Sequence, residues 1–327
     1  MKIIIPVAGA GARLRPHTHT KPKPILPVAG KPMIDHIIDD VLPLKPTEII
    51  FVTGHLKDRL EKHIKEQYKD KVAIKFVEQK ELNGTAGAVW LGKEAFDEDI
   101  MIIFGDTIFS ADLNVIKHCK DDAIAWAMHV EDPRRFGVFV TDKDNHVVKF
   151  VEKPQEFVSN LASIGVFWVK NTKLLAEGIE HTLKNKKEGK EAYLTDAWSY
   201  MVEKGAKIKV EQCTGWYDCG TPEAMLETNR VLLEKHKGKH HVEIVDTVTI
   251  IPPCAIDPSA HLENCVVGPY VTIGALATIK DCIIRNSIID KEANVSYTLL
   301  EKSLIGENAR VRGVMRNIQL GDHSTLE

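Results

Sequence analysis

Residues 3–13 read Ile3-Ile-Ile-Pro-Val7 and then Ala8-Gly-Ala-Gly-Ala-Arg13, and they are the starting point for predicting the fold. The apolar run from Ile3 to Val7 predicts a buried strand. The small residues after it end the strand and let backbone N–H groups come close to a ligand, and such groups bind anions well. We therefore predict that an anionic ligand lies against five residues: Ala8, Gly9, Ala10, Gly11 and Ala12.

Two cations follow this loop. Arg13 comes directly after it, and a guanidinium is always charged and fits phosphate oxygens two at a time. Lys23 stands between Pro22 and Pro24, whose rings restrict the backbone and so help to hold the ammonium in place. A strand, a loop of small residues and two cations together predict a cradle for a triphosphate.

Other glycine-rich loops are alternatives for the same stretch. A dinucleotide-binding fingerprint needs a third glycine three residues after Gly11, where this chain has Leu14. A Walker loop needs Gly-Lys followed by Ser or Thr, which the stretch also lacks. On the glycines alone, an ordinary tight turn between a strand and a helix stays open.

The composition fits a protein of two globular domains. Of 327 residues, 44% are hydrophobic and 27% are charged, so each domain can bury a core of its own. The formal net charge of −3 gives no sign of a nucleic-acid surface, and no apolar run reaches the ~18 residues of a membrane span. Because the six cysteines show no CxxC spacing and we find no signal peptide, we expect reduced thiols in a cytoplasmic protein.

Strands and helices alternate after the loop. The spacing of apolar residues predicts one helix and then three strands, over residues 33–42, 48–53, 72–77 and 99–104. This alternation predicts an α/β fold with a mixed, mainly parallel sheet and helices on both faces. Because ligands bind at the carboxyl ends of strands in such sheets, we expect the loops after Val7, Val77 and Phe104 to form the site.

Asp106 follows the last of these strands. A carboxylate at that end of a strand, opposite a phosphate-binding loop, suits Mg²⁺, because a hard cation prefers hard anionic oxygens. An aspartate in such a place is by itself more often a turn or cap residue. Together with the loop and Arg13, it favours a metal ligand.

The opening stretch also carries a family resemblance. Gly9–Pro16, GAGARLRP, and Lys21–Pro32, KPKPILPVAGKP, resemble the signature of sugar-1-phosphate nucleotidylyltransferases. The resemblance implies a Rossmann-like nucleotidyltransferase domain, Mg²⁺ as cofactor, and two substrates, a nucleoside triphosphate and a sugar 1-phosphate. The family usually has Thr or Ser where this chain has Ala12, so one phosphate-facing hydroxyl is missing while the backbone N–H remains.

Residues 78–88, EQKELNGTAGA, resemble the segment in which the family contacts the nucleobase. The resemblance implies that Gln79, Gly84 and Thr85 bind the nucleotide, with Gln79 at a pyrimidine edge. The plain alternative is a loop followed by a helix that Asn83 or Thr85 caps. Gly-Thr-Ala-Gly also occurs in guanylyltransferase relatives, so the identity of the base stays open.

Three later segments, Phe136–Val138, Glu152–Pro154 and Ser159–Val166, resemble the sugar-binding part of the family, and most of all its glucose-1-phosphate thymidylyltransferases. The resemblance implies that the hexose lies against the backbone of Gly137, that Glu152 accepts from sugar hydroxyls and that Lys153 binds the sugar phosphate. Asn160 and Gly165 fall in the next sugar-facing segment. Without the resemblance, adjacent Glu and Lys on a loop would be a solvated pair of little energetic weight.

Trp216–Pro222, WYDCGTP, resembles the segment with the family's second metal-binding aspartate, which here is Asp218. The resemblance also implies roles for the charged residues. Asp106 and Asp218 hold Mg²⁺ against the α-phosphate, Arg13 stabilises the leaving pyrophosphate, and Lys23 binds a phosphate. An ordinary turn aspartate is the alternative for Asp218.

The last third of the chain is periodic. Aliphatic residues recur every five or six positions, at Ile256, Leu262, Val267, Ile273, Ile279, Ile284, Ile289, Val295, Leu300, Ile305 and Val311. Repeats of this length predict a parallel β-helix with an aliphatic column inside, of about three coils of ~18 residues. The resemblance to long family members implies a left-handed β-helix of hexapeptide repeats. We therefore predict a catalytic domain over 1–238 and a β-helix over 239–327.

The predicted reaction joins dTTP or UTP to glucose 1-phosphate and gives a sugar nucleotide and pyrophosphate. One alternative is a mannose-1-phosphate guanylyltransferase, and another is a non-catalytic, sugar-nucleotide-binding regulatory homologue, which only Ala12 favours. For the β-helix we expect packing or self-association into a homo-dimer or tetramer rather than acyl transfer. We expect no nucleic-acid or membrane partner.

Overall fold

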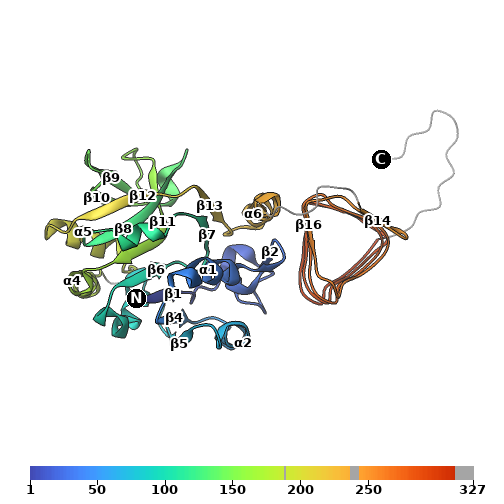
Figure 1. Cartoon of the computed structure of the whole chain (residues 1–327), viewed down its shortest axis with the longest axis horizontal. Helices are drawn as coiled ribbons and strands as arrows, with labels where there is room; N and C mark the ends of the chain where they lie inside the picture. Colours follow the sequence, from blue (N-terminus) through green and yellow to red (C-terminus); the bar gives the residue numbers. More distant parts are fainter. Residues whose placement is uncertain (188, 236–242, 314–327) are drawn as a thin grey trace. The chain divides into compact units, whose positions relative to one another are not determined.

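The computed structural model of the chain describes residues 1–187, 189–235 and 243–313 (Figure 1). These residues fall into two compact units. The larger unit contains Met1–Leu26 and Pro32–Thr221, and the smaller unit contains Pro27–Lys31 and the described residues from Pro222 onward. The boundary predicted between residues 238 and 239 lies outside the described residues, so the predicted division stays a prediction.

The larger unit is built on one nine-stranded sheet. The strands follow the order β10-β9-β11-β6-β1-β4-β5, and β8 pairs with β11 and β12. Their bounds are β1 Lys2–Pro6, β4 Glu48–Thr53, β5 Ala73–Glu78, β6 Ile100–Ile103, β8 Ala123–His129, β9 Gly137–Thr141, β10 Val147–Glu152, β11 Leu161–Val169 and β12 Ile208–Gln212. The other strands and α-helices before Pro222 are the short strands β2 Pro27–Val28 and β3 Lys31–Pro32, the pair β7 Thr107–Ser110 and β13 Gly215–Asp218, and helices α1 Met33–Val41, α2 Lys57–Tyr68, α3 Thr85–Leu91, α4 Thr172–Lys184 and α5 Leu194–Glu203.

The sheet is mixed, as predicted, and its parallel and antiparallel strand pairs are equal in number. Strand β1 pairs in parallel with β4 and β6, and parallel pairs also join β4 to β5 and β8 to β12. Strand β11 instead runs antiparallel to β6, β8 and β9, and β9 runs antiparallel to β10. We did not predict β11 as a strand, because Gly165 interrupts its apolar pattern. In the structure, Gly165 has a φ of 76°, and the pairing of β11 with β8 is irregular around it.

Two hydrophobic clusters lie on opposite faces of this sheet. Ile4 of β1 packs in the cluster with α3, α4 and α5, whereas Ile3 and Ile5 pack in the cluster with α1 and α2. Strand β1 is apolar throughout because both of its faces are buried, as is usual in sheets covered by helices on both sides. Helices on both faces of an α/β sheet confirm that part of the prediction (Figure 1). None of the helices in the described ranges is long and apolar enough to cross a membrane.

The smaller unit contains helix α6, Pro222–Lys235, and stacked strands that pair in parallel, except that the first of them is antiparallel to the second. The strands are β14 Glu243–Val245, β15 Val248–Ile250, β16 Cys254–Ile256, β17 His261–Val267, β18 Val271–Ile273, β19 Thr278–Arg285, β20 Ile288–Ile289, β21 Asn294–Ser296, β22 Leu299–Glu301, β23 Leu304–Ile305 and β24 Arg310–Arg312. Seen end-on in Figure 1, the coils that they form outline a triangle. All eleven aliphatic residues of the predicted column belong to one hydrophobic cluster inside these coils.

The coils are slightly shorter than three repeats of six. Val248 pairs with Cys265 in the next coil, and Thr278 pairs with Asn294 in the coil after its own. In each pair, the two residues are separated by fewer positions than the length of three full hexapeptides. The corners are tight turns that use left-handed residues, among them Asn264 and Asp281 at one corner, and Asn and Asp tolerate this conformation well. Parallel strands in coils of this kind are consistent with the predicted β-helix, in which some repeats fall short of a hexapeptide.

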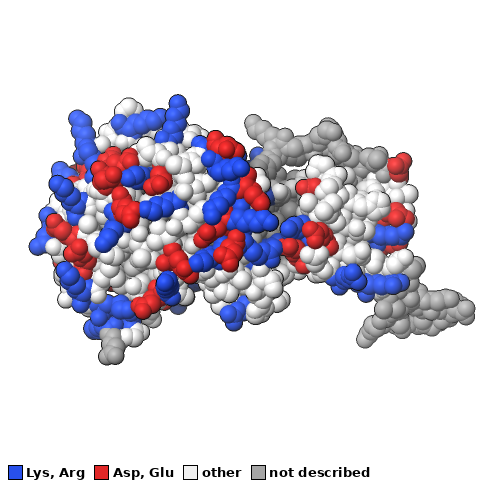
Figure 2. Space-filling view, turned by 90° about the horizontal axis from the view of Figure 1, so that it is seen from below, with Lys and Arg blue, Asp and Glu red and all other residues white. Residues whose placement is uncertain are grey.

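Charges of both signs are mixed over the surface of the larger unit that faces the viewer in Figure 2. Lys and Arg side chains lie among Asp and Glu side chains there, so this face has no extended area of one sign. A nucleic-acid surface requires a concentration of positive charge that neutralises phosphates. No such concentration is visible on this one face, and the expectation of no nucleic-acid partner stays a prediction.

Candidate functional site

A first cavity in the larger unit lies at the carboxyl ends of β1, β5 and β6. The loops after these three strands line it, as the sequence predicted. The predicted residues that line it are Ala8, Gly9, Gly11, Ala12, Arg13, Lys23, Gln79, Gly84, Thr85 and Asp106. Ala10, which was predicted with them, belongs to the loop but is not among the lining residues.

The loop after β1 leaves room for a ligand at Gly9. A Cβ built on Gly9 would meet no atom within 4 Å. Gly11 is different, since it has a φ of 62° and a Cβ there would come within 3.0 Å of Thr18 and 3.1 Å of Lys23. The Thr18 hydroxyl also donates to the Gly11 carbonyl, at 2.9 Å. The loop is thus held tightly on one side and open at Gly9.

Lys23 lies beside Asp106. Its side chain is largely buried, and its Nζ is 2.9 Å from Oδ2 of Asp106. The lysine begins a short 3-10 helix, Lys23–Ile25, that has Pro22 at its N-cap and Pro24 within its first turn. As predicted from the two prolines, this backbone is restricted, and it directs the ammonium toward the cavity rather than into solvent.

Gln79 is buried at the first cavity, and its Nε2 donates to Oδ1 of Asn83 at 3.1 Å. Gly84 and Thr85 have roles within the fold that the sequence did not reveal. A Cβ on Gly84 would meet the Ala192 carbonyl oxygen at 2.3 Å, and the φ of Gly84 is 107°. The Thr85 hydroxyl accepts from the backbone N–H of Leu194 at 2.9 Å. Both residues therefore hold the segment before α5 against the cavity.

The second cavity lies beside the first and has a volume of about 350 Å³. Arg13, Thr85, Phe104, Asp106 and Glu191 line both cavities. The predicted residues Gly137, Glu152, Lys153, Gly165 and Asp218 line the second one. Two ligands, one in each cavity, would therefore meet at Arg13 and Asp106.

Asn160 is the predicted sugar-binding residue that the structure does not bring to this cavity. Its side chain is exposed, and its Oδ1 lies 3.0 Å from Nδ1 of His129. Ser163 and Ile164 of β11, a few residues further along, line the cavity instead. The segment thus reaches the second cavity through Ser163 and Ile164, whereas Asn160, directly before β11, does not line it.

Glu152 forms one wall of the second cavity. Burial raises the pKa of its carboxyl, while Lys153 and the nearby Thr195 hydroxyl oppose part of that rise. The Lys153 Nζ is 3.7 Å from Oε1 of Glu152 and also lies over the ring of Tyr193, 5.4 Å from its centroid. A Cβ on Gly137 would come within 2.9 Å of Oε2 of Glu152. Glycine at this position therefore keeps the carboxylate accessible to a ligand.

The pairing of β7 with β13 brings Asp218 next to Asp106. Asp218 pairs with Thr107, the residue that follows Asp106 in the chain. Its Oδ1 accepts from the backbone N–H of Gly220 at 2.8 Å, which orients the carboxylate. Arg135 approaches the other oxygen of Asp218 to 3.9 Å.

The carboxylates of Asp106 and Asp218 suit a magnesium ion whose other ligands come from a substrate and from water. The described residues contain no group of three or more His, Cys, Asp or Glu side chains that could hold a metal ion by themselves. Mg²⁺ is usually bound through one or two carboxylates together with substrate phosphates and water. Asp106, which lines both cavities, and Asp218, which lines the second, match that pattern where the two cavities meet.

The structure adds residues that the sequence did not indicate. Arg135, Glu191, Tyr193, Thr195 and Trp198 line the second cavity. Four of them lie in or just before α5, which we predicted only as an amphipathic helix. Arg135 lies directly before the Phe-Gly-Val segment, and its position there was the one available signal.

Two adjoining cavities at the carboxyl ends of an α/β sheet are what an enzyme needs to bring a nucleotide together with a second substrate. Residues 2–235 match the model of the nucleotidyl transferase family, and the chain belongs to that family. The resemblance found in the sequence is therefore confirmed at the level of family and enzyme class.

Individual relatives agree with this assignment. The chain is 34% identical to the bifunctional protein GlmU of Methanocaldococcus jannaschii, over 94% of this chain and 78% of the relative. It is 27% identical to a glucose-1-phosphate thymidylyltransferase of Streptomyces antibioticus, over 100% of this chain and 99% of the relative. A solved structure of UDP-glucose pyrophosphorylase complexed with UDP-glucose matches 72% of this chain and 99% of its own, with a TM-score of 0.61 and 26% identity.

Proposed function

We propose that this enzyme transfers a nucleotidyl group from a nucleoside triphosphate to a sugar 1-phosphate. The observation that carries the proposal is the junction of the two cavities at Arg13 and Asp106. The first cavity has the small-residue loop and the cations that suit a triphosphate. The second has the carboxylate and the lysine that suit the hydroxyls and the phosphate of a sugar phosphate.

In this reaction an oxygen of the sugar 1-phosphate forms a bond to the α-phosphorus of the triphosphate. The bond from that phosphorus to the bridging oxygen of the β-phosphate breaks, and pyrophosphate leaves with the electron pair. Both reactants are anions, so positioning and charge neutralisation dominate the catalysis. No nucleophilic side chain is required, and we assign none.

The residues of the first cavity act on the triphosphate. Backbone N–H groups of Gly9 to Ala12 hold its oxygens, Lys23 binds a phosphate, and Arg13 stabilises the charge on the leaving pyrophosphate. Asp106, which lines both cavities, and Asp218, which lines the second, would hold Mg²⁺, which when bound neutralises phosphate charge.

The residues of the second cavity act on the sugar 1-phosphate. Lys153 binds its phosphate, Glu152 accepts from its hydroxyls, and Gly137 lets the ring lie against the backbone. The buried amide of Gln79, which by the family resemblance faces a pyrimidine, supports dTTP or UTP as the nucleotide. Relatives named for glucose 1-phosphate and UDP-glucose support glucose 1-phosphate as the acceptor.

For the smaller unit we propose a left-handed β-helix that takes part in self-association into a dimer or tetramer. The parallel pairing of the strands from β15 onward with their equivalents one coil away, as between Val248 and Cys265, supports the β-helix. Large apolar side chains on its surface support self-association, since Leu276 and Leu299 are 62% and 69% exposed.

The test is pyrophosphate release in the presence of Mg²⁺, with several nucleoside triphosphates paired with glucose, mannose, galactose and N-acetylglucosamine 1-phosphates. We expect one strong pair, dTTP or UTP with glucose 1-phosphate. Strong activity with GTP and mannose 1-phosphate would keep the reaction and change the substrates. If folded protein that binds a sugar nucleotide releases no pyrophosphate with any pair of substrates, the regulatory alternative is favoured. Ala12→Thr would then be the variant to assay.

A further inference from the structure

The hairpin over residues 27–32 belongs to the stretch that resembles the family signature, but the proposed reaction gives it no role. Among the described residues that line the two cavities, none lies between 27 and 32, whereas Lys23 and Pro24 line the first cavity. By its contacts, Pro27–Lys31 belongs to the smaller unit, although the chain on either side of it belongs to the larger unit. The hairpin therefore has a role other than direct contact with a substrate.

The turn at the tip of this hairpin is strained. Strands β2 and β3 pair with each other, and the two residues Ala29 and Gly30 join them. Their φ values are 49° and 89°, both positive, as in the type I′ turns of two-residue hairpins. Glycine adopts such a φ freely, but in alanine the Cβ crowds the backbone, and Asn, Asp or Gly is usual at the first turn position. The turn at Ala29 therefore needs support from outside the hairpin.

Asn229 of α6 supplies that support. Its side chain is 1% exposed, and its Oδ1 accepts from the backbone N–H of Ala29 at 2.8 Å. The same oxygen accepts from the Thr272 hydroxyl at 2.7 Å, and Nδ2 donates to the Tyr270 carbonyl at 3.2 Å. The smaller unit thus fixes the amide of Asn229 with its oxygen toward the strained turn.

The base of the hairpin leads to Lys23. The backbone N–H of Leu26 donates to the Lys23 carbonyl at 3.1 Å, and the N–H of Met33 donates to the Leu26 carbonyl, also at 3.1 Å. These bonds close the base of the hairpin directly after the short helix that Lys23 begins. The Lys23 ammonium lies 2.9 Å from Oδ2 of Asp106, so a shift of this backbone would displace a cation of the first cavity.

We propose that Asn229 is a positioning residue for the reaction. By holding the strained turn at Ala29 it fixes the hairpin and, through the base of the hairpin, the place of the Lys23 ammonium. This inference rests on the proposed function, since it takes Lys23 to bind a triphosphate. Asn229 is not among the residues that line either cavity, so it acts only through the backbone that leads to Lys23.

The first experiment measures the KM for both substrates in Asn229→Ala and in Thr272→Val. We expect Asn229→Ala to raise the KM for the nucleoside triphosphate about tenfold, because a small displacement of a positioning group is costly. The KM for the sugar 1-phosphate should not change, because Lys23 lines the first cavity only. Thr272→Val is the matched control and should change neither KM, since it removes a buried hydrogen bond to the same oxygen of Asn229 but keeps the bond to Ala29.

The second experiment restores the turn without the asparagine. Glycine at position 29 adopts the positive φ without strain, so Ala29→Gly removes the need for support there. Added to Asn229→Ala, it should bring the KM for the triphosphate back to within about twofold of the wild-type value, because the two changes act on one turn. A protein whose smaller unit is merely loosened would gain nothing from Ala29→Gly.

A third measurement does not depend on turnover. Titration calorimetry with an α,β-methylene analogue of the nucleoside triphosphate, without a sugar, should show affinity lowered in Asn229→Ala by the same factor as the KM is raised. Unchanged affinity in Asn229→Ala, the same loss in Thr272→Val, or a loss that Ala29→Gly does not reverse would each overturn the positioning role and leave the reaction intact. No pyrophosphate release by the wild-type protein with any pair of substrates would overturn both.

Discussion

Among single residues, Asp218 combines a hydrogen bond that serves the local fold with a negative charge that, in our proposal, binds a metal ion. One of its oxygens accepts from the Gly220 N–H, and an asparagine can keep that hydrogen bond through its amide oxygen. What an asparagine cannot keep is the negative charge. The substitution therefore separates a structural role from a metal-binding role.

We expect Asp218→Asn to lower kcat by about 100-fold or more and to leave the melting temperature unchanged, because it removes one of two anionic ligands for Mg²⁺. Steady-state kinetics over a range of Mg²⁺ concentrations and thermal unfolding would measure both effects. Asp112→Asn is a matched control, since Asp112 accepts in the same way from the N–H two residues further along, at 2.9 Å. Activity retained in Asp218→Asn would contradict the two-carboxylate metal site.

Glu152 gives a pH-dependent prediction. Burial raises its pKa above the ordinary value of 4.5, so the folded protein holds this proton to higher pH than the unfolded chain does. Folding stability then falls as the pH rises from that ordinary value through the raised value, and above it the cost of the buried charge is fully present. Glu152→Gln should remove this contribution.

The measurement is the free energy of unfolding from pH 4 to 8 for the wild-type protein and for Glu152→Gln. We expect the variant to gain stability relative to the wild type as the pH rises through this window, and to bind the sugar 1-phosphate more weakly throughout. A difference in stability that is constant with pH would show that Glu152 titrates at its ordinary pKa.

Among the elements of the fold, two loops each need a glycine, Gly9 in one and Gly84 in the other, but for different physical reasons. At Gly9 there is open space, so the residue is small because a ligand approaches, according to our proposal. At Gly84 another segment of the chain crosses at van der Waals distance, and the backbone has a positive φ. The first glycine belongs to the site, and the second belongs to the fold that builds the site.

Alanine substitutions distinguish the two. Gly9→Ala should leave the free energy of unfolding within about 0.5 kcal/mol of the wild type and raise the KM for the nucleoside triphosphate about tenfold. Gly84→Ala should lower the free energy of unfolding by about 2 kcal/mol or more, because it combines a strained φ with a clash against Ala192. Denaturant unfolding and nucleotide kinetics on both variants test this. A destabilised Gly9→Ala together with a stable Gly84→Ala would refute the assignment.

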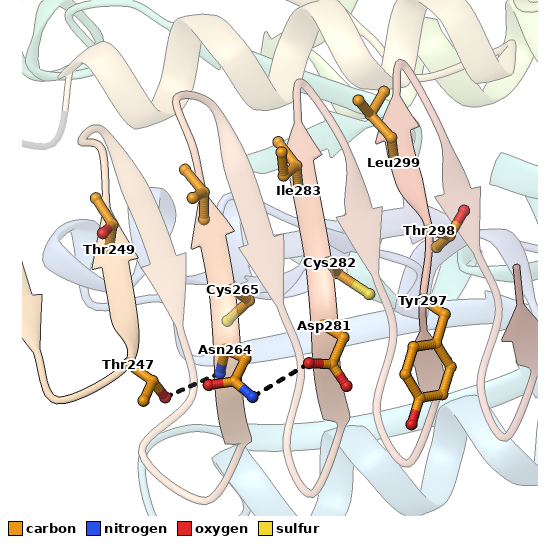
Figure 3. A pocket seen from close by; sticks show the side chains of 11 residues that line it. Thr247, Thr249, Asn264, Cys265, Asp281, Cys282, Ile283, Tyr297, Thr298 and Leu299 are labelled. Carbon is orange, nitrogen blue, oxygen red and sulfur yellow. Dashed lines mark hydrogen bonds between the residues drawn. The ribbon is translucent and has the colours of Figure 1, made fainter. Parts of the chain in front are cut away.

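For the molecule as a whole, the question is what covers the apolar surface of the smaller unit. Ile283 and Leu299 point outward from neighbouring coils on the face shown in Figure 3, and Cys282 lies next to Ile283 in the chain. Along the corner beside them, Asn264 donates to Asp281 at 3.1 Å, so polar groups there are already paired within the unit. An aliphatic row beside satisfied polar groups suits contact with another copy.

We therefore expect the purified chain to have a native mass that is two or four times 36.6 kDa in solution. Light scattering coupled to size exclusion, over a hundredfold range of concentration, measures this directly. A mass of 36.6 kDa at every concentration would contradict the proposed self-association. It would leave the proposed reaction untouched, because both cavities lie within the larger unit.

Features that depend on neighbours in the chain or on a short repeat could be predicted without the structure. The strand, loop and cations from Ile3 to Lys23 were evident, because close approach to an anion requires small residues and positive charge in one short stretch. The aliphatic column of the coils was also evident, because each residue packs on its equivalent one coil away, and all eleven predicted residues lie in that cluster.

How distant segments meet became apparent only in the folded chain. Asp106 and Asp218 come together because β13 pairs with β7, and no local pattern encodes that register. The same holds for the crossing of Ala192 at Gly84, the position of Asn160 outside the second cavity, and the antiparallel course of β11. Pairing and burial are properties of the tertiary structure, because they depend on contacts between residues far apart in sequence.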